Sequence, residues 1–305
     1  MQIGDSTSFL MIVGAPKSAT TTLANWLARH PEMVLTETKE PRFFADFGQY
    51  TWTGPASRHF SDSLIRDEET YFASFAEKAG AHWAVDASTD YLWCEAAPDK
   101  ILAWSRRFNT KLICVLRDPV DRAFSEYQHS VRDNYETETF ARSLDLEAHR
   151  IADHWHPLFY HCRRSRYNSA VNRYQELFGD SLMIMDFREF FDPERCAAKV
   201  SSFLGLQTPV EPSGERENAS FVYRRPGIAR IVKSPLAVRV GRALVPKAMR
   251  KSLRAGLDRQ IATQYQRSTE DVNRLRALLA DEIEACKANP LIPTDGWSAA
   301  TGEGA

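Results

Sequence analysis

The sequence has few cysteines, no long apolar run and almost no net charge. Its five cysteines are widely spaced and include no Cys-x-x-Cys pair, so it predicts neither a disulfide framework nor a zinc site. No apolar run approaches the roughly 18 residues of a spanning helix, and no basic cluster precedes the first apolar run, as a secretory signal would require. A formal net charge of -1 gives no general attraction to nucleic acid or membranes. We therefore expect a cytoplasmic protein without nucleic-acid or membrane partners.

The residue pattern is typical of an α/β fold. The 305 residues are 43% hydrophobic, enough to bury a large core. Short apolar runs alternate with helical patterns, as in βαβ units, so we predict a single domain with a central parallel sheet flanked by helices. Residues 1–297 are assigned to this domain and 298–305 to a disordered tail. Expected strands lie at 9–13, 83–85, 111–116 and 182–185, and expected helices at 20–29, 101–108, 119–127, 167–178, a stretch ending near 204, and 270–286.

The segment GAPKSATTT, residues 14–22, connects the first expected strand to the first expected helix. Backbone N–H groups, the helix dipole and nearby hydroxyls converge at such a connection, so the segment is typical of a phosphate-binding loop. An ATP-binding loop of the G-x-x-x-x-G-K-[ST] type would need glycine at 19 and lysine at 20, where this sequence has Ala19 and Thr20. The lysine present, Lys17, precedes the helix and is expected to reach a different oxygen of the ligand.

A second strand-turn-helix follows at residues 112–129, with Arg117 at the end of the strand and Ser125 two helical turns further on. The two segments, PKSATTT and RDPVDRAFS, resemble the motifs PK[ST]GTT and R-[DN]-P-x-x-R-x-x-S of the sulfotransferase family that uses 3′-phosphoadenosine 5′-phosphosulfate (PAPS). A third segment, KEPRFF after His30-Pro31, is similar to the HP…KE…FF segment of the heparan-type and related bacterial sulfotransferases.

The resemblance implies a P-loop NTPase-like sulfotransferase fold and an activity. The expected reaction moves a sulfuryl group from PAPS to a hydroxyl or amine of a small-molecule or glycoside acceptor by in-line displacement, leaving 3′-phosphoadenosine 5′-phosphate (PAP). Lys17 would meet the charge that builds on the leaving oxygen. Arg117 and Ser125 would bind the 3′-phosphate. No metal is expected, because a sulfuryl group carries less charge than a phosphoryl group. The loop residues expected to hold the 5′-phosphosulfate are Lys17, Ser18, Ala19, Thr20, Thr21 and Thr22.

Two residues compete for the role of the base that takes the proton of the acceptor. Glu40 matches the acidic residue that heparan-type enzymes use in this segment, and it is the first choice. His129 matches a histidine that follows the R-x-x-S-x-Y-x run in some relatives and assists catalysis there. Both are expected to line the acceptor pocket.

The sequence also departs from the family pattern. Ala19 replaces a glycine, so a positive φ at this position would strain the loop. Ala87 stands where heparan-type enzymes have a lysine, which removes one cationic contact to the acceptor or the cofactor. Late in the chain, Arg224, Arg225 and Gly227 are similar to the loop that completes the 3′-phosphate site. They open a basic segment, 224–259, most of which is expected to form a solvated helical face.

Two other functions fit parts of this pattern. A P-loop small-molecule kinase shares the sheet and the loop, but the Gly-Lys pair and an evident magnesium-binding acid are missing. A non-catalytic nucleotide-binding protein of the same fold is compatible with the altered loop. The presence of residues expected in an active enzyme argues against it, and these are Lys17, Arg117, Ser125 and Glu40. The identity of the acceptor, the choice between O- and N-sulfation and the oligomeric state stay open.

Overall fold

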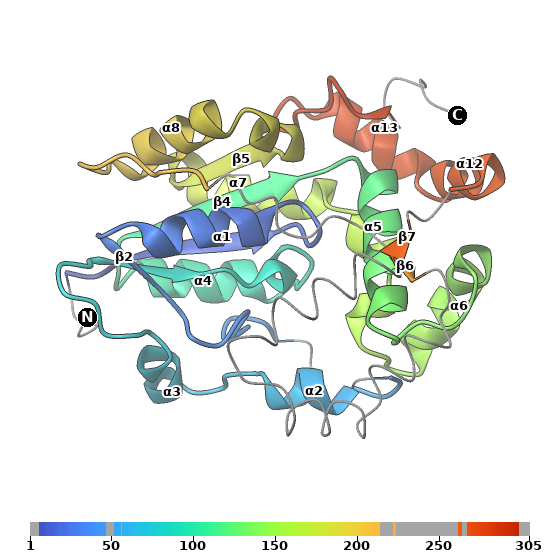
Figure 1. Cartoon of the computed structure of the whole chain (residues 1–305), viewed down its shortest axis with the longest axis horizontal. Helices are drawn as coiled ribbons and strands as arrows, with labels where there is room; N and C mark the ends of the chain where they lie inside the picture. Colours follow the sequence, from blue (N-terminus) through green and yellow to red (C-terminus); the bar gives the residue numbers. More distant parts are fainter. Residues whose placement is uncertain are drawn as a thin grey trace.

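The centre of the protein is a five-stranded parallel sheet with strand order β2-β3-β1-β4-β5 (Figure 1). The computed structural model describes residues 6–46, 52–55, 57–213, 222–223, 262–263 and 267–298. The sheet confirms the predicted fold, although the shortest strand, β2, was missed because three residues show no periodicity. The strands are β1 (Ser8–Gly14), β2 (Met33–Leu35), β3 (Trp83–Asp86), β4 (Thr110–Leu116) and β5 (Leu182–Asp186).

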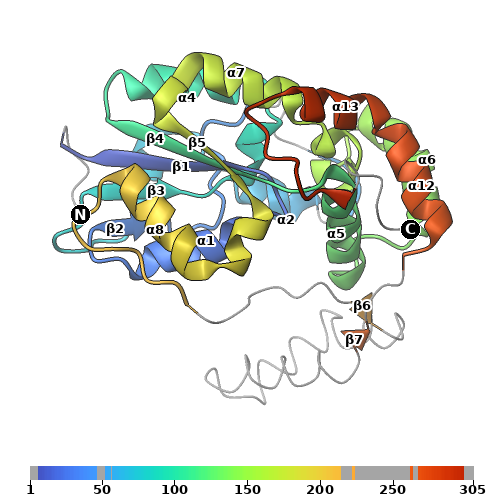
Figure 2. The same ribbon diagram turned by 90° about the horizontal axis from the view of Figure 1, so that it is seen from above.

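Both faces of the sheet are buried, which explains why its strands are continuous apolar runs. Successive side chains of β1 point to opposite faces, so Phe9 and Met11 join one apolar cluster whereas Leu10 and Ile12 join another. Figure 2 shows that helices cover both faces. One pair is α4 (Ala97–Ser105) and α7 (Asn168–Phe178), and the other is α1 (Thr20–Arg29) and α8 (Pro193–Leu204).

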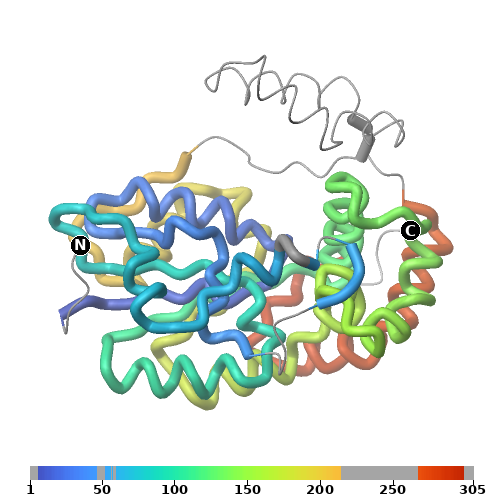
Figure 3. The backbone as a smooth tube through the Cα atoms, turned by 90° about the horizontal axis from the view of Figure 1, so that it is seen from below, coloured from blue at the N-terminus to red at the C-terminus, as the bar shows by residue number. Residues whose placement is uncertain are grey.

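Four further helices lie beyond the carboxyl ends of the strands, and the two late ones lie beside α6 (Figure 3). They are α5 (Pro119–Arg132), α6 (Phe140–Ala152), α12 (Thr269–Leu278) and α13 (Ala280–Ala288). The prediction of one helix over 270–286 is wrong, because the helix is interrupted at Leu279, whose φ is -110°. Leu279 is nevertheless fully buried, and beyond it Glu282 accepts hydrogen bonds from the amides of Tyr167 and Asn168 at 2.9 and 2.8 Å.

The remaining elements are short. They are α2 (Ser57–Asp62), α3 (Glu68–Ala73), the 3-10 helices η1 (Thr89–Leu92), η2 (Pro157–Phe159), η3 (Arg163–Ser165), η4 (Gly179–Ser181) and η5 (Phe187–Phe191), and the antiparallel pair β6 (Val222–Tyr223) and β7 (Ala262–Thr263). Within the described ranges no helix has the length and apolar character needed to cross a bilayer. The predicted site residues Arg224, Arg225 and Gly227, and residues 299–305 of the expected tail, lie outside the described residues.

Candidate active site

A cavity of about 880 Å³ lies where the carboxyl ends of β1 and β4 meet α5. In a parallel sheet the loops that follow the strands gather at one edge, so segments far apart in the sequence come together there. The structure brings all of the predicted site residues that it describes to this one cavity. They are Lys17, Ser18, Ala19, Thr20, Thr21, Thr22, Glu40, Arg117, Ser125 and His129.

The loop between β1 and α1 forms one end of the cavity. Lys17 and Ala19 have φ angles of 67° and 62°, in the left-handed region, so the chain turns sharply before α1 begins at Thr20. The Oγ atom of Ser18 is buried and has no hydrogen-bond partner among the residues described. A buried hydroxyl without a partner costs stability, and an anion at the start of α1 would give it one.

Replacing Ala19 with glycine should raise the free energy of unfolding by about 0.5–1 kcal/mol. The left-handed conformation costs an L-residue about 1–2 kcal/mol, and glycine removes this cost. Part of the gain is lost again, because glycine also has greater conformational freedom in the unfolded chain. Urea denaturation measures the difference. Ala277, exposed on the right-handed α12, is the matched control, and Ala277→Gly should lower the stability by about 1 kcal/mol. A loss of stability in Ala19→Gly would contradict a left-handed Ala19.

The ammonium group of Lys17 has unusual electrostatic surroundings. Burial lowers its pKa to about 8, and the nearby positive charges of Arg132 and Lys39 act in the same direction. A bound anion would favour the charged form of this lysine and oppose the effect of burial on its pKa. The cavity therefore presents a cation that is prepared for a negatively charged ligand.

Arg117 directly follows β4 and lies beside the loop that precedes α1. Its guanidinium group lies over the ring of Phe187, 4.5 Å from the ring centre, and donates a hydrogen bond to the backbone oxygen of Lys17 at 3.1 Å. Its Nε atom is buried without a partner in the described part of the chain, and burial lowers the pKa of the group. The carbonyl oxygen of Arg117 accepts a hydrogen bond from the hydroxyl of Tyr167. These contacts fix Arg117 in place and leave donor capacity for an anion.

Glu40 lies in a tight turn, and both of its carboxylate oxygens have partners. Oε2 accepts a hydrogen bond from Arg42 at 2.7 Å, and Oε1 accepts one from Thr89 at 3.3 Å. The side chain of Glu40 is 20% exposed. Glu40 is therefore an ion-paired, oriented carboxylate at the cavity wall, which suits it to accept a proton from a bound ligand.

His129, the other candidate base, comes from α5. Its Nε2 atom is 3.3 Å from Asp133, and its Nδ1 atom is buried with no partner among the described residues. Burial, followed by the charge of Lys17, lowers the pKa of His129 to about 3, so the ring is neutral at ordinary pH. A neutral imidazole can also accept a proton, and the geometry leaves both candidates in place.

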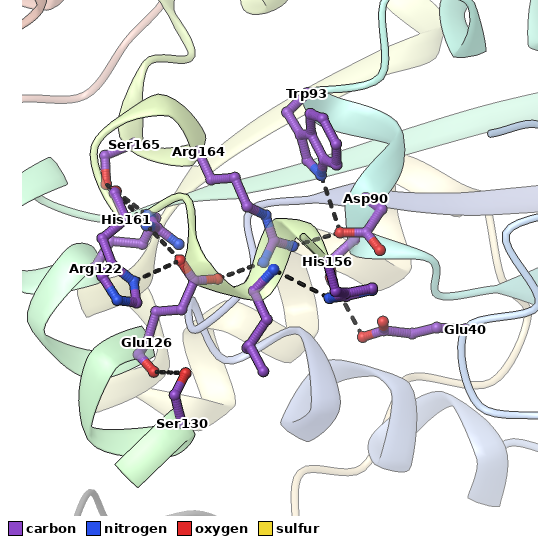
Figure 4. Close-up of polar contacts among 12 residues, drawn as sticks. Glu40, Asp90, Trp93, Arg122, Glu126, Ser130, His156, His161, Arg164 and Ser165 are labelled. Carbon is purple, nitrogen blue, oxygen red and sulfur yellow. Dashed lines mark hydrogen bonds and ion pairs between the residues drawn. The ribbon is translucent and has the colours of Figure 1, made fainter. Parts of the chain in front are cut away.

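Sequence analysis missed a set of buried charges at the base of the cavity. Figure 4 shows Arg164 between Asp90 and Glu126, with hydrogen bonds to both carboxylates. Arg122 donates to Glu126 at 2.9 Å, and Arg42 donates to Asp90 at 2.5 Å. Most of these partners are far apart in the sequence, so no local pattern links them. The available signals were Arg122, the second arginine of the RDPVDRAFS motif, and Arg42, the arginine of KEPRFF.

Aromatic side chains line two parts of the cavity. Trp26, Phe187 and Phe190 lie among the lining residues, and Phe187 is in contact with Arg117. Elsewhere on the wall, the ring of Phe60 stacks on that of His156, with 3.6 Å between ring centres and 15° between planes. No cluster of His, Cys, Asp or Glu suited to a metal occurs among the described residues.

A phosphate-type loop after the first strand of a parallel sheet, facing an arginine after the fourth, is the arrangement of a group-transfer enzyme that binds an anionic donor. The profile of the sulfotransferase family matches residues 10–210, so the chain belongs to that family. This confirms the family predicted from the three motifs, and the chain is accordingly a transferase.

Solved structures resemble the chain to different degrees. A sulfotransferase from Alicyclobacillus acidocaldarius is 33% identical, with a TM-score of 0.62, and the match covers 68% of this chain and 85% of that one. Mouse sulfotransferase SULT7A1, complexed with PAP, is 18% identical over 85% of this chain and 90% of its own, with a TM-score of 0.41. Retinol dehydratase, in complex with androsterone and inactive cofactor PAP, is 11% identical, with a TM-score of 0.45, and the match covers 92% of this chain and 82% of that one. No curated protein is similar enough to count as a match.

Proposed function

We propose that the protein transfers a sulfuryl group from PAPS to a hydroxyl or amine of a small-molecule or glycoside acceptor. The observation that carries the proposal is the single cavity lined by the β1 loop, by Arg117 and Ser125, and by two candidate bases. In the reaction the acceptor oxygen or nitrogen forms a bond to sulfur while the bond from sulfur to the 5′-phosphate oxygen breaks. The proton of the acceptor passes to the base, and PAP leaves.

The residues of the cavity fit the donor. The amides at the start of α1 and the hydroxyls of Ser18 and its neighbours would hold the 5′-phosphosulfate, with Lys17 at the leaving oxygen. Arg117 and Ser125 would hold the 3′-phosphate, completed by Arg224, Arg225 and Gly227. The Ser18 Oγ and Arg117 Nε atoms, which have no hydrogen-bond partner among the described residues, support this placement, because both can donate to an anion. The reaction requires no metal ion.

We assign the base to Glu40 first and to His129 second. Glu40 is an oriented carboxylate, whereas burial and the charge of Lys17 lower the pKa of His129 and make its ring a weaker base than an ordinary imidazole. The wall near Glu40 includes Phe60, Tyr135 and His156, which favours an acceptor that presents an apolar ring beside its nucleophile.

The direct test is transfer of sulfur-35 from labelled PAPS to a panel of phenols, amino sugars and glycosides. We expect label in an acceptor and an equal amount of PAP, with Mg²⁺ present or absent. Transfer of phosphate from ATP in the presence of Mg²⁺, with no sulfuryl transfer, would instead establish the kinase alternative. Nucleotide binding without any transfer would establish the non-catalytic one.

Binding of PAP should weaken as the pH rises above about 8. An anion at Lys17 needs the charged lysine, whose pKa in the empty site is about 8, so binding is full well below that pH and is lost above it. The Kd for PAP should then rise by up to about tenfold per pH unit. Calorimetry between about pH 7 and about pH 9.5 measures this, with Lys17→Met expected to bind weakly at every pH. A wild-type Kd that stays constant would contradict contact between Lys17 and the cofactor.

A further inference from the structure

Five charged residues form a buried chain that begins at Arg42, next to Glu40, and ends on α5. We call Arg42, Asp90, Arg164, Glu126 and Arg122 the charge chain. Each is at most 8% exposed, and each ion-pairs with the next in that order. Taking charges out of water is costly, and removing one member strands its partner, so such a chain constrains the segments that carry it.

The charge chain is not neutral by itself. It holds three guanidinium groups and two carboxylates, and Glu40, paired with Arg42, supplies the third negative charge. Burial alone would raise the pKa of Asp90 and of Glu126, but the adjacent guanidinium groups outweigh it and hold both pKa values below their usual range. The two carboxylates are therefore ionised, and Arg42, at the end of the chain next to the cavity, pairs with Glu40 as well as with Asp90.

The turn that carries Glu40 is held at several points. Glu40 and Arg42 have φ angles of 54° and 53°, a conformation that side chains disfavour and that surrounding contacts must maintain. The backbone N–H of Arg42 donates to Ser88 Oγ at 2.9 Å, and Ser88 donates to Asp86 at 2.6 Å, which joins the turn to the end of β3. Through its side chain, Arg42 also contacts Asp90 and Glu40, so it connects the charge chain to the carboxylate that faces the cavity.

We propose that Arg42 is a positioning residue for Glu40, and that the charge chain keeps this carboxylate directed at the acceptor. The inference rests on the proposed function. Arg42 acts through Glu40, whose carboxylate it holds in place by a hydrogen bond at 2.7 Å. As the acceptor forms its bond to sulfur and the bond from sulfur to the 5′-phosphate oxygen breaks, the proton of the acceptor moves to a Glu40 oxygen, and it passes to solvent once the product has left. Because it serves only the base, Arg42 contributes nothing to cofactor affinity.

A double-mutant cycle separates this role from a merely structural one. Arg42→Gln should lower kcat by about 100-fold, with the acceptor KM and the Kd for PAP within about threefold of wild type. In a Glu40→Gln background the same change should cost less than about threefold, because the base is already gone. Arg42→Lys, which keeps the charge, should recover part of kcat. Arg107, paired with Glu68 on the surface, is the matched control, and Arg107→Gln should leave kcat unchanged.

Equal losses from Arg42→Gln in both backgrounds, or a weaker Kd for PAP, would overturn the proposal. Hydrogen exchange gives a readout that needs no turnover. The backbone amides of residues 39, 40 and 42–44 should exchange faster in Arg42→Gln than in Arg107→Gln, and unchanged exchange would also overturn the proposal. A wild-type protein that transfers no sulfuryl group would refute the proposed function, whereas the exchange experiment would still decide whether Arg42 holds the turn.

Discussion

Replacing Lys17 with alanine should lower kcat by about 10²- to 10³-fold while the protein stays folded. In sulfuryl transfer, negative charge builds on the 5′-phosphate oxygen as its bond to sulfur breaks, and a fixed donor there stabilises the transition state more than the ground state. Lys17 is the lysine that the β1 loop brings into the cavity. Steady-state kinetics with saturating PAPS and acceptor measure the effect.

The matched control for this substitution is Lys287→Ala. Lys287 pairs with Glu284 on the surface of α13, away from the cavity, so its removal should leave kcat within about twofold of wild type. Circular dichroism and an unchanged unfolding midpoint would show that both variants are folded. Near-normal turnover in Lys17→Ala would refute the role assigned to the lysine, whatever its effect on cofactor binding.

Replacing Glu126 with glutamine should lower the free energy of unfolding by about 3–5 kcal/mol at neutral pH. Glu126 is fully buried and accepts hydrogen bonds from Arg122 and Arg164, so its loss removes the buried carboxylate that pairs with Arg122 and leaves Arg164 with Asp90 alone. Urea denaturation monitored by tryptophan fluorescence measures the change. Glu68→Gln is the control, because its pair with Arg107 is exposed and should contribute less than about 1 kcal/mol.

The stabilisation by Glu126 should also depend on pH. Its folded-state pKa lies below the ordinary value of 4.5, because Arg122 and Arg164 outweigh the opposing effect of burial. Stabilisation is therefore complete above about pH 5 and is lost as the pH falls through and below 4.5, where the unfolded chain takes up the proton first. The difference in stability between wild type and Glu126→Gln should shrink in acid. A difference that is constant from about pH 7 to about pH 3 would contradict an ionised Glu126.

The fold and the gathering of two loops at one cavity were predictable because their signals are local. A buried parallel strand is a continuous apolar run, and the loops after β1 and β4 carry short motifs. Parallel topology then places those loops at one edge of the sheet, so Lys17 and Arg117 meet although they are 100 positions apart. The possible strain at Ala19 was also foreseeable, since the family pattern has glycine there and the structure shows the positive φ.

The charge chain could not be predicted from the sequence. Asp90 and Arg164 are separated by 74 positions, and Arg164 and Glu126 by 38, so their pairing depends on how η1, η3 and α5 pack together. The break at Leu279 could not be predicted for a similar reason. The apolar residues Leu275, Leu279 and Ile283 keep helical spacing, but the helix is interrupted where this segment packs on α5 and α6. Tertiary contacts decide both features.

The measurement that tests the central claim most directly is calorimetric titration of the purified protein with PAP and, separately, with ATP, both without Mg²⁺. The account predicts that PAP binds at least about 100-fold more tightly than ATP and that Arg117→Ala abolishes this binding, because a guanidinium fork at the 3′-phosphate is lost. Preference for ATP, or PAP binding that survives in Arg117→Ala, would contradict the account and make the cavity a site for a different nucleotide.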